Sequence, residues 1–342
     1  MIKLFLQLTC QFMVKLNKVI SGKGVLMLSY SKNLDYNIIQ IDTGYLRQGL
    51  AACYLVIDSG RVAVIDTGVE HTASRVEEVL REQGLTTDNV DFIVPTHVHL
   101  DHAGGAGKLM QICQNASLVI HPFGSRHMID PSRLIAGAEA VYGKEGLHRS
   151  VGEIIPVDRD RVIEAADSYR FMLGSRELLV IDTPGHARHH FCIWDEASKG
   201  FFTGDTFGLA YPELECDGRS FIFPPTTPVQ FDPAAWHASI DRLMAMHPER
   251  MYLTHFGQLD EPVVYMNDLH RRIDDLAALA LDHDKSAADL DLAASVNAYV
   301  NQELTAHGSK LDKEKLGQIL DLDIDLIVQG LQVWVSRQRE SE

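Results

Sequence analysis

The chain has 342 residues, of which 46% are hydrophobic, and a formal net charge of −16 at pH 7, so it can fill the core of one large domain with an appendage. The acidic balance argues against a nucleic-acid partner, because phosphates are bound by clustered Lys and Arg, and no apolar run is long enough to span a membrane. Five scattered cysteines without a Cys-x-x-Cys pair are typical of a reducing compartment and predict a cytoplasmic protein.

The first 27 residues are expected to lie outside the main domain. An apolar stretch from Leu4 to Val14 is flanked by lysines, as in a secretory signal, but no small-residue cleavage site is evident. We interpret residues 1–27 as a disordered extension, or as the result of a start site upstream of Met27. A signal peptide is the alternative.

A domain of alternating strands and helices is expected over residues 28–260. The runs predicted as strands are residues 38–41, 53–57, 62–65 and 91–95, and the predicted helix is residues 72–82. Residues 58–61, with the sequence Asp-Ser-Gly-Arg, predict a hairpin turn. This alternation is typical of a layered α/β domain.

A cluster of metal-ligand residues follows the fourth of these strands. Three imidazoles and one carboxylate occur within six positions, as His97, His99, Asp101 and His102. His and Asp are poor core formers unless they are paired, and four together at a strand end would be unfavourable unless a cation binds them. The loop therefore predicts metal binding, and its spacing allows the side chains to face two neighbouring sites.

Three later strands each end in one further ligand-type residue. These residues are His186, Asp205 and His255, and each follows a short apolar run. The carboxyl ends of strands are the usual place for a site in a layered α/β protein. A single His after a strand is more often a hydrogen-bonded loop residue, but the three in this order indicate that they complete the metal-binding loop.

Two insertions and a helical segment complete the chain. Residues 122–152 predict a helical excursion, centred on 131–142, where a lid or pocket wall would lie. Residues 207–233 form a long loop rich in aromatics and prolines, which favours an ordered pocket. Residues 261–342 have apolar positions at helical spacing and predict three amphipathic helices. We expect them to pack as a small bundle on the main domain, with a substrate lid or a homodimer contact as the alternatives.

These fragments together resemble the metallo-β-lactamase-fold hydrolases. The signature of that family is His-x-His-x-Asp-His followed by a later His, an Asp and a last His. The resemblance covers residues 38–257, and all seven ligand positions are filled. It implies an α/β fold, the four-layer αββα metallo-β-lactamase sandwich, here with a C-terminal helical extension, and it implies a dinuclear metal site.

Carried over residue by residue, the resemblance assigns both metal sites. The first metal would be held by His97, His99 and His186, the second by Asp101, His102 and His255, with Asp205 as the bridge. Asp66 matches an early aspartate of the fold that would orient a ligand imidazole rather than contact a metal. Two divalent ions are implied. Zn is the first expectation and Fe or Mn the alternatives, since imidazole and carboxylate ligands suit all three.

Such a site implies hydrolysis. Two cations roughly 3.5–4 Å apart would share a water whose pKa can fall to about 7, and the bridging hydroxide would attack an electrophilic carbon or phosphorus. Asp101 would be a ligand and would also accept a hydrogen bond from this nucleophile. His190 is the first candidate for the proton donor to the leaving group and Tyr211 the second, although each could instead be a pocket residue.

The expected substrate is a small molecule with an ester-type bond: a thioester, a lactone or a phosphodiester. Asp205 in the bridging position is similar to those branches of the family rather than to β-lactamases proper. The candidate substrate-binding residues lie in the aromatic loop and are Tyr211, Arg219, Phe221 and Phe223. Arg219 is either a surface charge or a partner for a substrate anion.

Two other classes of protein compete with a hydrolase. The first is a di-iron protein that binds or reduces oxygen, but relatives of that kind carry Glu at the position of His99 and often append a flavin-binding domain. Residues 261–342 show no Gly-rich phosphate loop. The second is a non-catalytic binding protein that retains metals for stability, which is compatible with the complete ligand set.

Overall fold

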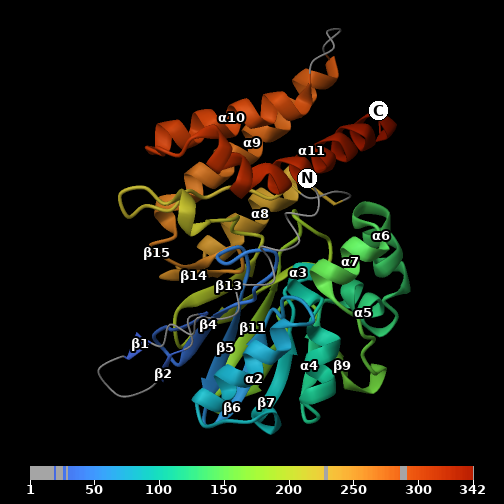
Figure 1. Ribbon diagram of the computed structural model, residues 1–342, viewed down its shortest axis with the longest axis vertical. Helices are drawn as coiled ribbons and strands as arrows, with labels where there is room; N and C mark the ends of the chain where they lie inside the picture. The colour runs from blue at the N-terminus through green and yellow to red at the C-terminus, as the bar shows by residue number, and fades with distance from the viewer. Residues whose placement is uncertain (1–18, 21–25, 28–29, 227–229, 286–290, 342) are drawn as a thin grey trace, which may run out of the picture.

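A computed structural model describes residues 19–20, 26–27, 30–226, 230–285 and 291–341. The predicted N-terminal extension, residues 1–27, thus lies outside the described residues except for the short antiparallel pair β1 (Val19–Ile20) and β2 (Leu26–Met27). The rest of the described chain forms two β-sheets with helices on their outer faces and at one end (Figure 1).

The first sheet has seven strands that follow one another in chain order. They are β3 (Ser31–Asn33), β4 (Ile38–Asp42), β5 (Ala52–Asp58), β6 (Arg61–Ile65), β7 (Val90–Val94), β8 (Ser117–Ile120) and β9 (Val162–Glu164). Strands β3 to β6 are antiparallel and β6 to β9 are parallel. Ser59 and Gly60, with φ of 51° and 75°, form the predicted hairpin turn, because such tight turns need positive φ at both central positions.

The second sheet has six strands. They are β10 (Arg170–Leu173), β11 (Arg176–Asp182), β12 (Phe191–Asp195), β13 (Gly200–Gly204), β14 (Arg250–Leu253) and β15 (Gly257–Asp260). All neighbours are antiparallel except β13 and β14, which are parallel. The parallel pair brings the carboxyl ends of β13 and β14, and the residues that follow them, to the same edge.

The two sheets pack face to face through an apolar layer. Tyr54 of β5 contacts Phe202 of β13 and Tyr252 of β14 edge to face, with ring centroids 5.4 and 5.8 Å apart. The outer helices are α2 (Thr72–Glu82) and α4 (Ala106–Ile112) on the first sheet, and α8 (Pro233–Met244) and α9 (Val263–Lys285) on the second. The predicted four-layer αββα sandwich is confirmed.

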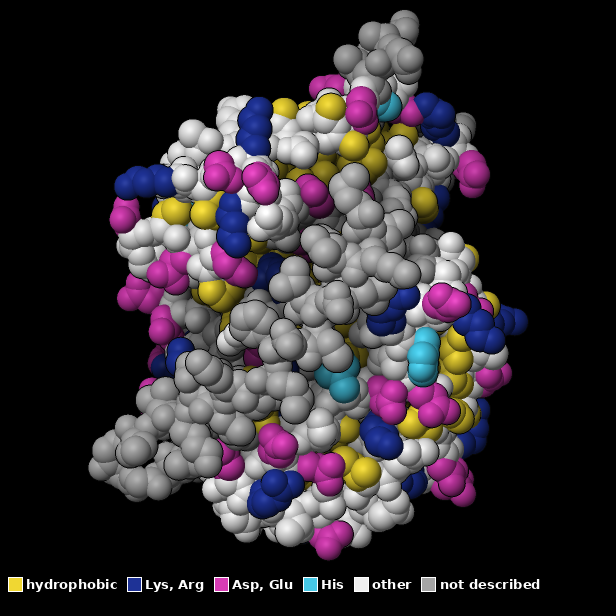
Figure 2. All heavy atoms as spheres, viewed as in Figure 1, with side chains coloured by type: hydrophobic (Ala, Val, Ile, Leu, Met, Phe, Trp, Pro, Cys, Tyr) yellow, Lys and Arg dark blue, Asp and Glu magenta, His cyan; other side chains and the backbone are white. Residues whose placement is uncertain are grey.

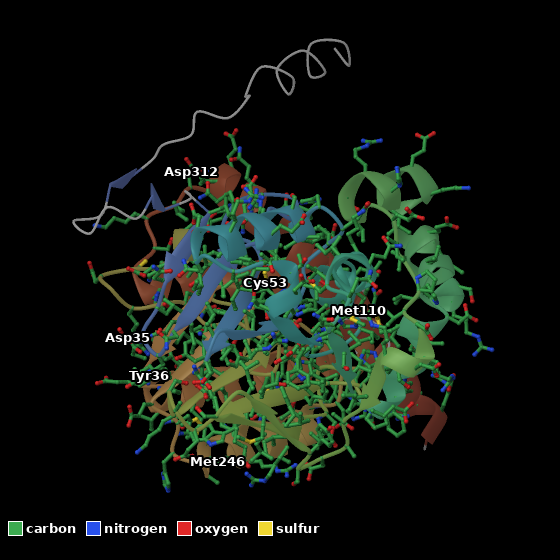
Figure 3. All side chains as sticks on the ribbon, turned by 90° about the horizontal axis from the view of Figure 1, so that it is seen from below. Asp35, Tyr36, Cys53, Met110, Met246 and Asp312 are labelled. Atoms are coloured by element: carbon green, nitrogen blue, oxygen red, sulfur yellow. The ribbon has the colours of Figure 1, made fainter. Side chains whose placement is uncertain are left out.

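The interior holds most of the sulfur-bearing side chains that the structure describes. Figure 3 shows Cys53 and Met110 toward the middle of the view, and both belong to the core between the first sheet and its helices. Cys53, Cys113 and Cys192 are buried, and the described cysteines, which include Cys216, carry free thiols. Within the described residues, no helix combines the length and apolar character needed to cross a membrane.

Two helical regions stand beside the sheets. The insertion after β8 forms α5 (Pro122–Ile129), α6 (Ser132–Tyr142) and α7 (Lys144–Val151), and the C-terminal segment forms α9, α10 (Leu292–His307) and α11 (Lys313–Ser341). The predicted C-terminal helices are therefore present. In Figure 1 they lie across one end of the sandwich, orange to red, with α11 running toward the green α6 and α7.

The C-terminal helices share their core with the second sheet. Leu269 of α9, Val296 of α10 and Leu331 of α11 are fully buried and belong to the same apolar cluster as Phe201 and Met251. Removal of these helices would expose that face of the sheet to water. The free energy of folding would become less favourable by about 25 cal/mol for each Å² of apolar surface exposed. The segment is thus packed as an integral part of the fold.

Candidate metal centre

Seven ligand-type side chains meet at the carboxyl ends of β7, β11, β13 and β14. Their donor atoms form two groups, each with all atoms within 4.8 Å of one another: His97, His99, His186 and Asp205 in one, and Asp101, His102 and His255 in the other. The structure therefore brings together all seven residues that the resemblance assigned to metal. Most of these ligands are buried, and Figure 2 shows only some of the histidines of the chain, near the middle and at the right of the view, among acidic and basic side chains.

The chain reaches these positions through tight turns at the strand ends. The loop after β7 runs directly into the short helix α3 (Leu100–Ala103), which carries two of the ligands. Asp205 is preceded by Gly204 with φ +47°, and a Cβ at that glycine would lie 2.5 Å from Oγ1 of Thr96 and from Nε2 of His190. Only glycine permits this close approach of the strand end to the loop after β7.

In the first group the ring nitrogens face one another. Nε2 of His97 is 2.8 Å from Nδ1 of His99, and Nε2 of His186 is 3.1 Å from the same atom. Nδ1 of His186 donates to the carbonyl of Pro225 at 2.8 Å. The neutral His186 ring therefore has its lone pair on Nε2, which faces the site. Three nitrogens converging in this way are suited to a shared cation.

The second group is oriented by hydrogen bonds from behind. Nδ1 of His102 donates to Asp66 at 2.9 Å, and Nδ1 of His255 donates to the carbonyl of Leu50 at 2.7 Å. Both rings therefore present Nε2 to the site, and the two Nε2 atoms are 3.3 Å apart. The Asp66 carboxylate also accepts the backbone N–H of Thr96 at 2.7 Å. Such partners fix the tautomer and direction of a metal-binding imidazole, so Asp66 occupies the orienting position that the resemblance implied.

Asp205 lies between the two groups. Its Oδ2 is 3.2 Å from Nε2 of His186, whereas its Oδ1 is 3.2 Å from Nε2 of His102 and 3.7 Å from Nε2 of His255. When His102 is neutral, as a metal ligand must be, its proton is on Nδ1, so its Nε2 cannot donate to Asp205, and Oδ1 is then buried without a hydrogen bond from the described residues. Acceptors facing each other in a dry site are unfavourable unless a cation lies between them. The donor set fits a carboxylate that bridges two cations.

The two groups differ in their electrostatics. Burial and the neighbouring His102 lower the pKa of His97 well below its usual value, and burial and His186 lower the pKa of His99 to about 3. These rings are neutral at pH 7, as metal ligands must be. Although burial opposes it, the charges of Asp205 and Asp66 raise the pKa of His102. The second group therefore carries an excess of negative charge that favours a cation.

Comparison with known proteins identifies the family. The sequence profile of the Metallo-beta-lactamase superfamily matches residues 46–255, which contain all seven ligand-type residues. The chain belongs to this superfamily. A metallo-beta-lactamase fold-containing protein of Sulfurisphaera tokodaii is 26% identical over 223 residues, which cover 63% of this chain and 76% of that protein.

Two further comparisons concern an enzyme and a solved structure, and the structure is that of the archaeal protein just named. An acyl-coenzyme A thioesterase of Gallus gallus is 29% identical over 192 residues, which cover 51% of this chain and 64% of the thioesterase. The crystal structure of an archaeal metallo-beta-lactamase superfamily protein from Sulfolobus tokodaii matches with a TM-score of 0.60 at 23% identity, over 87% of this chain and 99% of that one. At this identity the likeness shows the fold. The residues before the C-terminal helices make up less than 87% of the chain. A match over 87% of the chain must therefore include part of these helices.

His190, the first candidate for the proton donor, lies behind the metal centre. It is fully buried and is absent from the lining of the cavity over the ligands. Its Nε2 accepts the backbone N–H of Asp205 at 3.2 Å, and its Nδ1 lies 2.9 Å from the hydroxyl of Thr183. Both ring nitrogens are thus engaged within the protein. The structure places His190 where it positions Asp205, and not where it could reach a leaving group.

A cavity of about 390 Å³ opens over the ligands. Its floor is formed by His99, Asp101, Asp205 and His255, its side walls by α6 and the end of α7, and its roof by residues 322–329 of α11. Most of the wall side chains are apolar. The pocket of this metallo-beta-lactamase sandwich therefore takes part of its walls from the insertion and part from α11.

Only one of the four predicted substrate-binding residues lines this cavity. Tyr211 is buried on its wall, and its hydroxyl donates to Asp323 at 3.0 Å. Arg219 instead forms an exposed ion pair with Asp268 of α9 at 2.9 Å. Phe221 and Phe223 are buried in the core beneath the C-terminal helices. The aromatic loop thus serves mainly as packing for α9, because its large rings fill the space between that helix and the sheet.

Several polar residues of the cavity were not predicted from the sequence, and two of them lie close to the ligands or to Tyr211. Asp323 reaches the cavity from α11, and His189 lies beside His99 with ring centroids 5.7 Å apart. His189 is 7% exposed, and its Nδ1 has no hydrogen bond from the described residues. The pair His189–His190 gave one visible signal, but Asp323 alternates with other acidic and apolar residues in a helical stripe and gave none.

Proposed function

We propose that this protein is a dinuclear metal-dependent hydrolase of an ester-type bond, with a thioester as the first candidate and a lactone or phosphodiester as the alternatives. The observation that carries the proposal is the position of Asp205, whose two oxygens face two separate groups of ligands. This is the arrangement of a two-metal hydrolytic site. The relative named as an acyl-coenzyme A thioesterase favours the thioester.

The residues that would hold the cations are His97, His99 and His186 for one, Asp101, His102 and His255 for the other, and Asp205 for both. When bound, the two cations would lower the pKa of a water between them and stabilise negative charge on the reacting carbonyl or phosphoryl oxygen. Asp101 has a side chain 26% exposed on the cavity floor, where it can accept a hydrogen bond from the attacking water. Although burial opposes it, His102 and His255 lower the pKa of Asp101, so its carboxylate stays ionised at neutral pH.

Zinc is the metal we propose, because the set of five imidazoles and two carboxylates suits it well. The competing di-iron hypothesis is weakened by the imidazole at His99, whose Nδ1 converges with two other ring nitrogens of the first group. The cytoplasmic location and a homodimer formed through the C-terminal helices stay predictions.

A substrate panel combined with metal analysis tests the proposed function. The wild-type protein is loaded with Zn, Mn or Fe, its metal content is measured, and hydrolysis of thioesters, lactones and phosphodiesters is followed. We expect two metals per chain and one class of substrate cleaved with kcat/KM at least about 100-fold above the others. Protein that holds two metals but hydrolyses no class would contradict the proposal. Oxygen consumption by the iron-loaded form would favour the di-iron alternative.

A further inference from the structure

The roof of the cavity contributes a carboxyl group that no metal requires. Asp323 of α11 lines the same cavity as His99, Asp101, Asp205 and His255. It lies 68 positions after the last metal ligand in the sequence and belongs to neither group of ligand atoms. The reaction space is thus closed by one acidic side chain from the C-terminal segment.

Tyr211 holds this carboxyl in place. The Tyr211 hydroxyl donates to Oδ1 of Asp323 at 3.0 Å. The Tyr211 ring stands edge-on to the imidazole of His255, with centroids 6.3 Å apart, and carries the guanidinium of Arg47 at 4.6 Å on its face. Arg47 is held in turn by Glu213 at 2.7 Å. A buried tyrosine fixed between a metal ligand and an arginine therefore directs Asp323 over the floor.

The chemistry of ester-type hydrolysis needs a proton donor that the floor does not supply. Asp101 belongs to the second group of metal ligands, and His190 lies outside the cavity. Burial and the neighbouring His99 lower the pKa of His189 to about 2, so this ring is neutral and has no readily released proton. Burial and the charge of Asp323 raise the pKa of Tyr211 well above its usual value. None of these four groups is a suitable acid near pH 7.

Asp323 differs from them in its surroundings. Burial raises the pKa of Asp323 to about 6, and the charge of Asp101 raises it further. The Tyr211 hydroxyl, His255 and Arg47 act in the opposite direction and lower this pKa. A carboxyl with such a pKa is part protonated close to neutral pH and can act as a general acid, as is known for carboxyls in apolar pockets.

We propose that Asp323 is the catalytic acid of this site and gives its proton to the leaving atom of the substrate, with Tyr211 as the positioning residue. This rests on the proposed function. The attacking water loses one proton to solvent, and its oxygen forms a bond to the acyl carbon or phosphorus. The bond to the leaving oxygen or sulfur breaks with its electron pair going to that atom, which takes the Asp323 proton. Solvent then returns a proton to Asp323 through the cavity mouth, where Leu322 is 38% exposed. Helix α11 thereby completes the active site.

Substrates that differ only in their leaving group test this role. With the same acyl or phosphoryl group, an alkyl leaving group needs a proton as it departs, whereas p-nitrophenolate does not. In Asp323→Asn we expect kcat for the alkyl substrate to fall by about 10²–10³-fold, and kcat for the p-nitrophenyl substrate by less than about 5-fold. Asp323→Glu should recover part of the loss. Asp325→Asn, an exposed carboxyl on the same helix, should leave both substrates unchanged.

Two further measurements separate a chemical role from a structural one. The fall in wild-type kcat for the alkyl substrate with rising pH should be absent in Asp323→Asn, and Tyr211→Phe should shift its midpoint. In the metal-free protein, carboxyl NMR should show a group titrating near pH 6 that is missing in Asp323→Asn. Metal content and melting temperature are measured for each variant.

Three outcomes would overturn the proposal. Equal losses on the two leaving groups would show that Asp323 is structural or binds substrate, and no loss on either would show that it has no role. Wild-type protein with two metals that cleaves neither substrate would remove the proposed function, and this inference with it.

Discussion

The floor and the roof of the cavity are built in different ways. The floor comes from the ends of β7, β11, β13 and β14, where hydrogen bonds behind the rings orient His102, His186 and His255. The roof comes from α11, whose side chains reach the cavity only because the helix packs across the sandwich. The metal-ligand set is thus carried by strand ends, whereas the roof of the cavity is carried by a helix.

The largest effect is expected on the floor, from Asp205→Ala. Since Asp205 faces both groups of ligands, its removal should reduce metal content from two per chain to well below one and abolish hydrolysis. Asp182→Ala is the matched control, because that aspartate ends β11 of the same sheet but pairs with His121. If the folded Asp205→Ala protein kept two metals, the bridging assignment would be wrong.

His99→Ala should separate the two halves of the floor. His99 belongs to the first group, where its Nδ1 faces both His97 and His186, and it has no part in the second group. We expect metal content near one per chain, with the second site still filled. Loss of both metals at micromolar metal concentration would show that the sites fill as a unit and not independently.

Asp66→Asn should act on the second site through His102. The amide keeps the size of the side chain but weakens the hydrogen bond that holds the His102 ring with Nε2 toward the site. Loss of such an orienting partner typically lowers metal affinity by about 10–100-fold. Competition with a chelator measures the affinity of each site, and a decrease confined to the first site would contradict the assignment of Asp66 to His102.

The same contrast explains what could be predicted from the sequence. The strands that lead to the ligands, the ligand loop and the residues at the strand ends were predictable. A strand fixes where the next residue emerges, and a run such as His97 to His102 is rarely found outside a metal site. Asp323 was not, because an acidic residue in an amphipathic helix is usually solvated, and only the packing of α11 turns it inward. Arg219 and Phe221 were assigned to the pocket from composition alone, and the structure places both away from it.

A smaller effect, on substrate specificity, is expected from Leu326→Ala in the roof. Leu326 lines the cavity from α11, so its truncation should weaken the binding of substrates with long apolar groups and leave short substrates little changed. We expect KM for the long substrates to rise about 10-fold, because a lost methylene contact changes discrimination between substrates by roughly 10–200-fold. Val328→Ala on the same helix is the control, because this side chain faces the core and should lower the melting temperature instead. Equal KM changes for long and short substrates would show that α11 does not determine substrate specificity.

The smallest effect is expected from Arg219→Ala. From the sequence, an arginine in an aromatic loop next to Asp205 could have paired with a substrate anion, and KM would then rise on its removal. In the structure its guanidinium pairs with Asp268 at 2.9 Å and is half exposed, and exposed pairs of this kind contribute about 0.2–1 kcal/mol. We therefore expect unchanged metal content and KM, and a small decrease in melting temperature that Asp268→Ala reproduces. A raised KM in Arg219→Ala but not in Asp268→Ala would show that Arg219 binds the substrate. It would also mean that the loop over residues 207–226 moves toward the cavity when substrate binds.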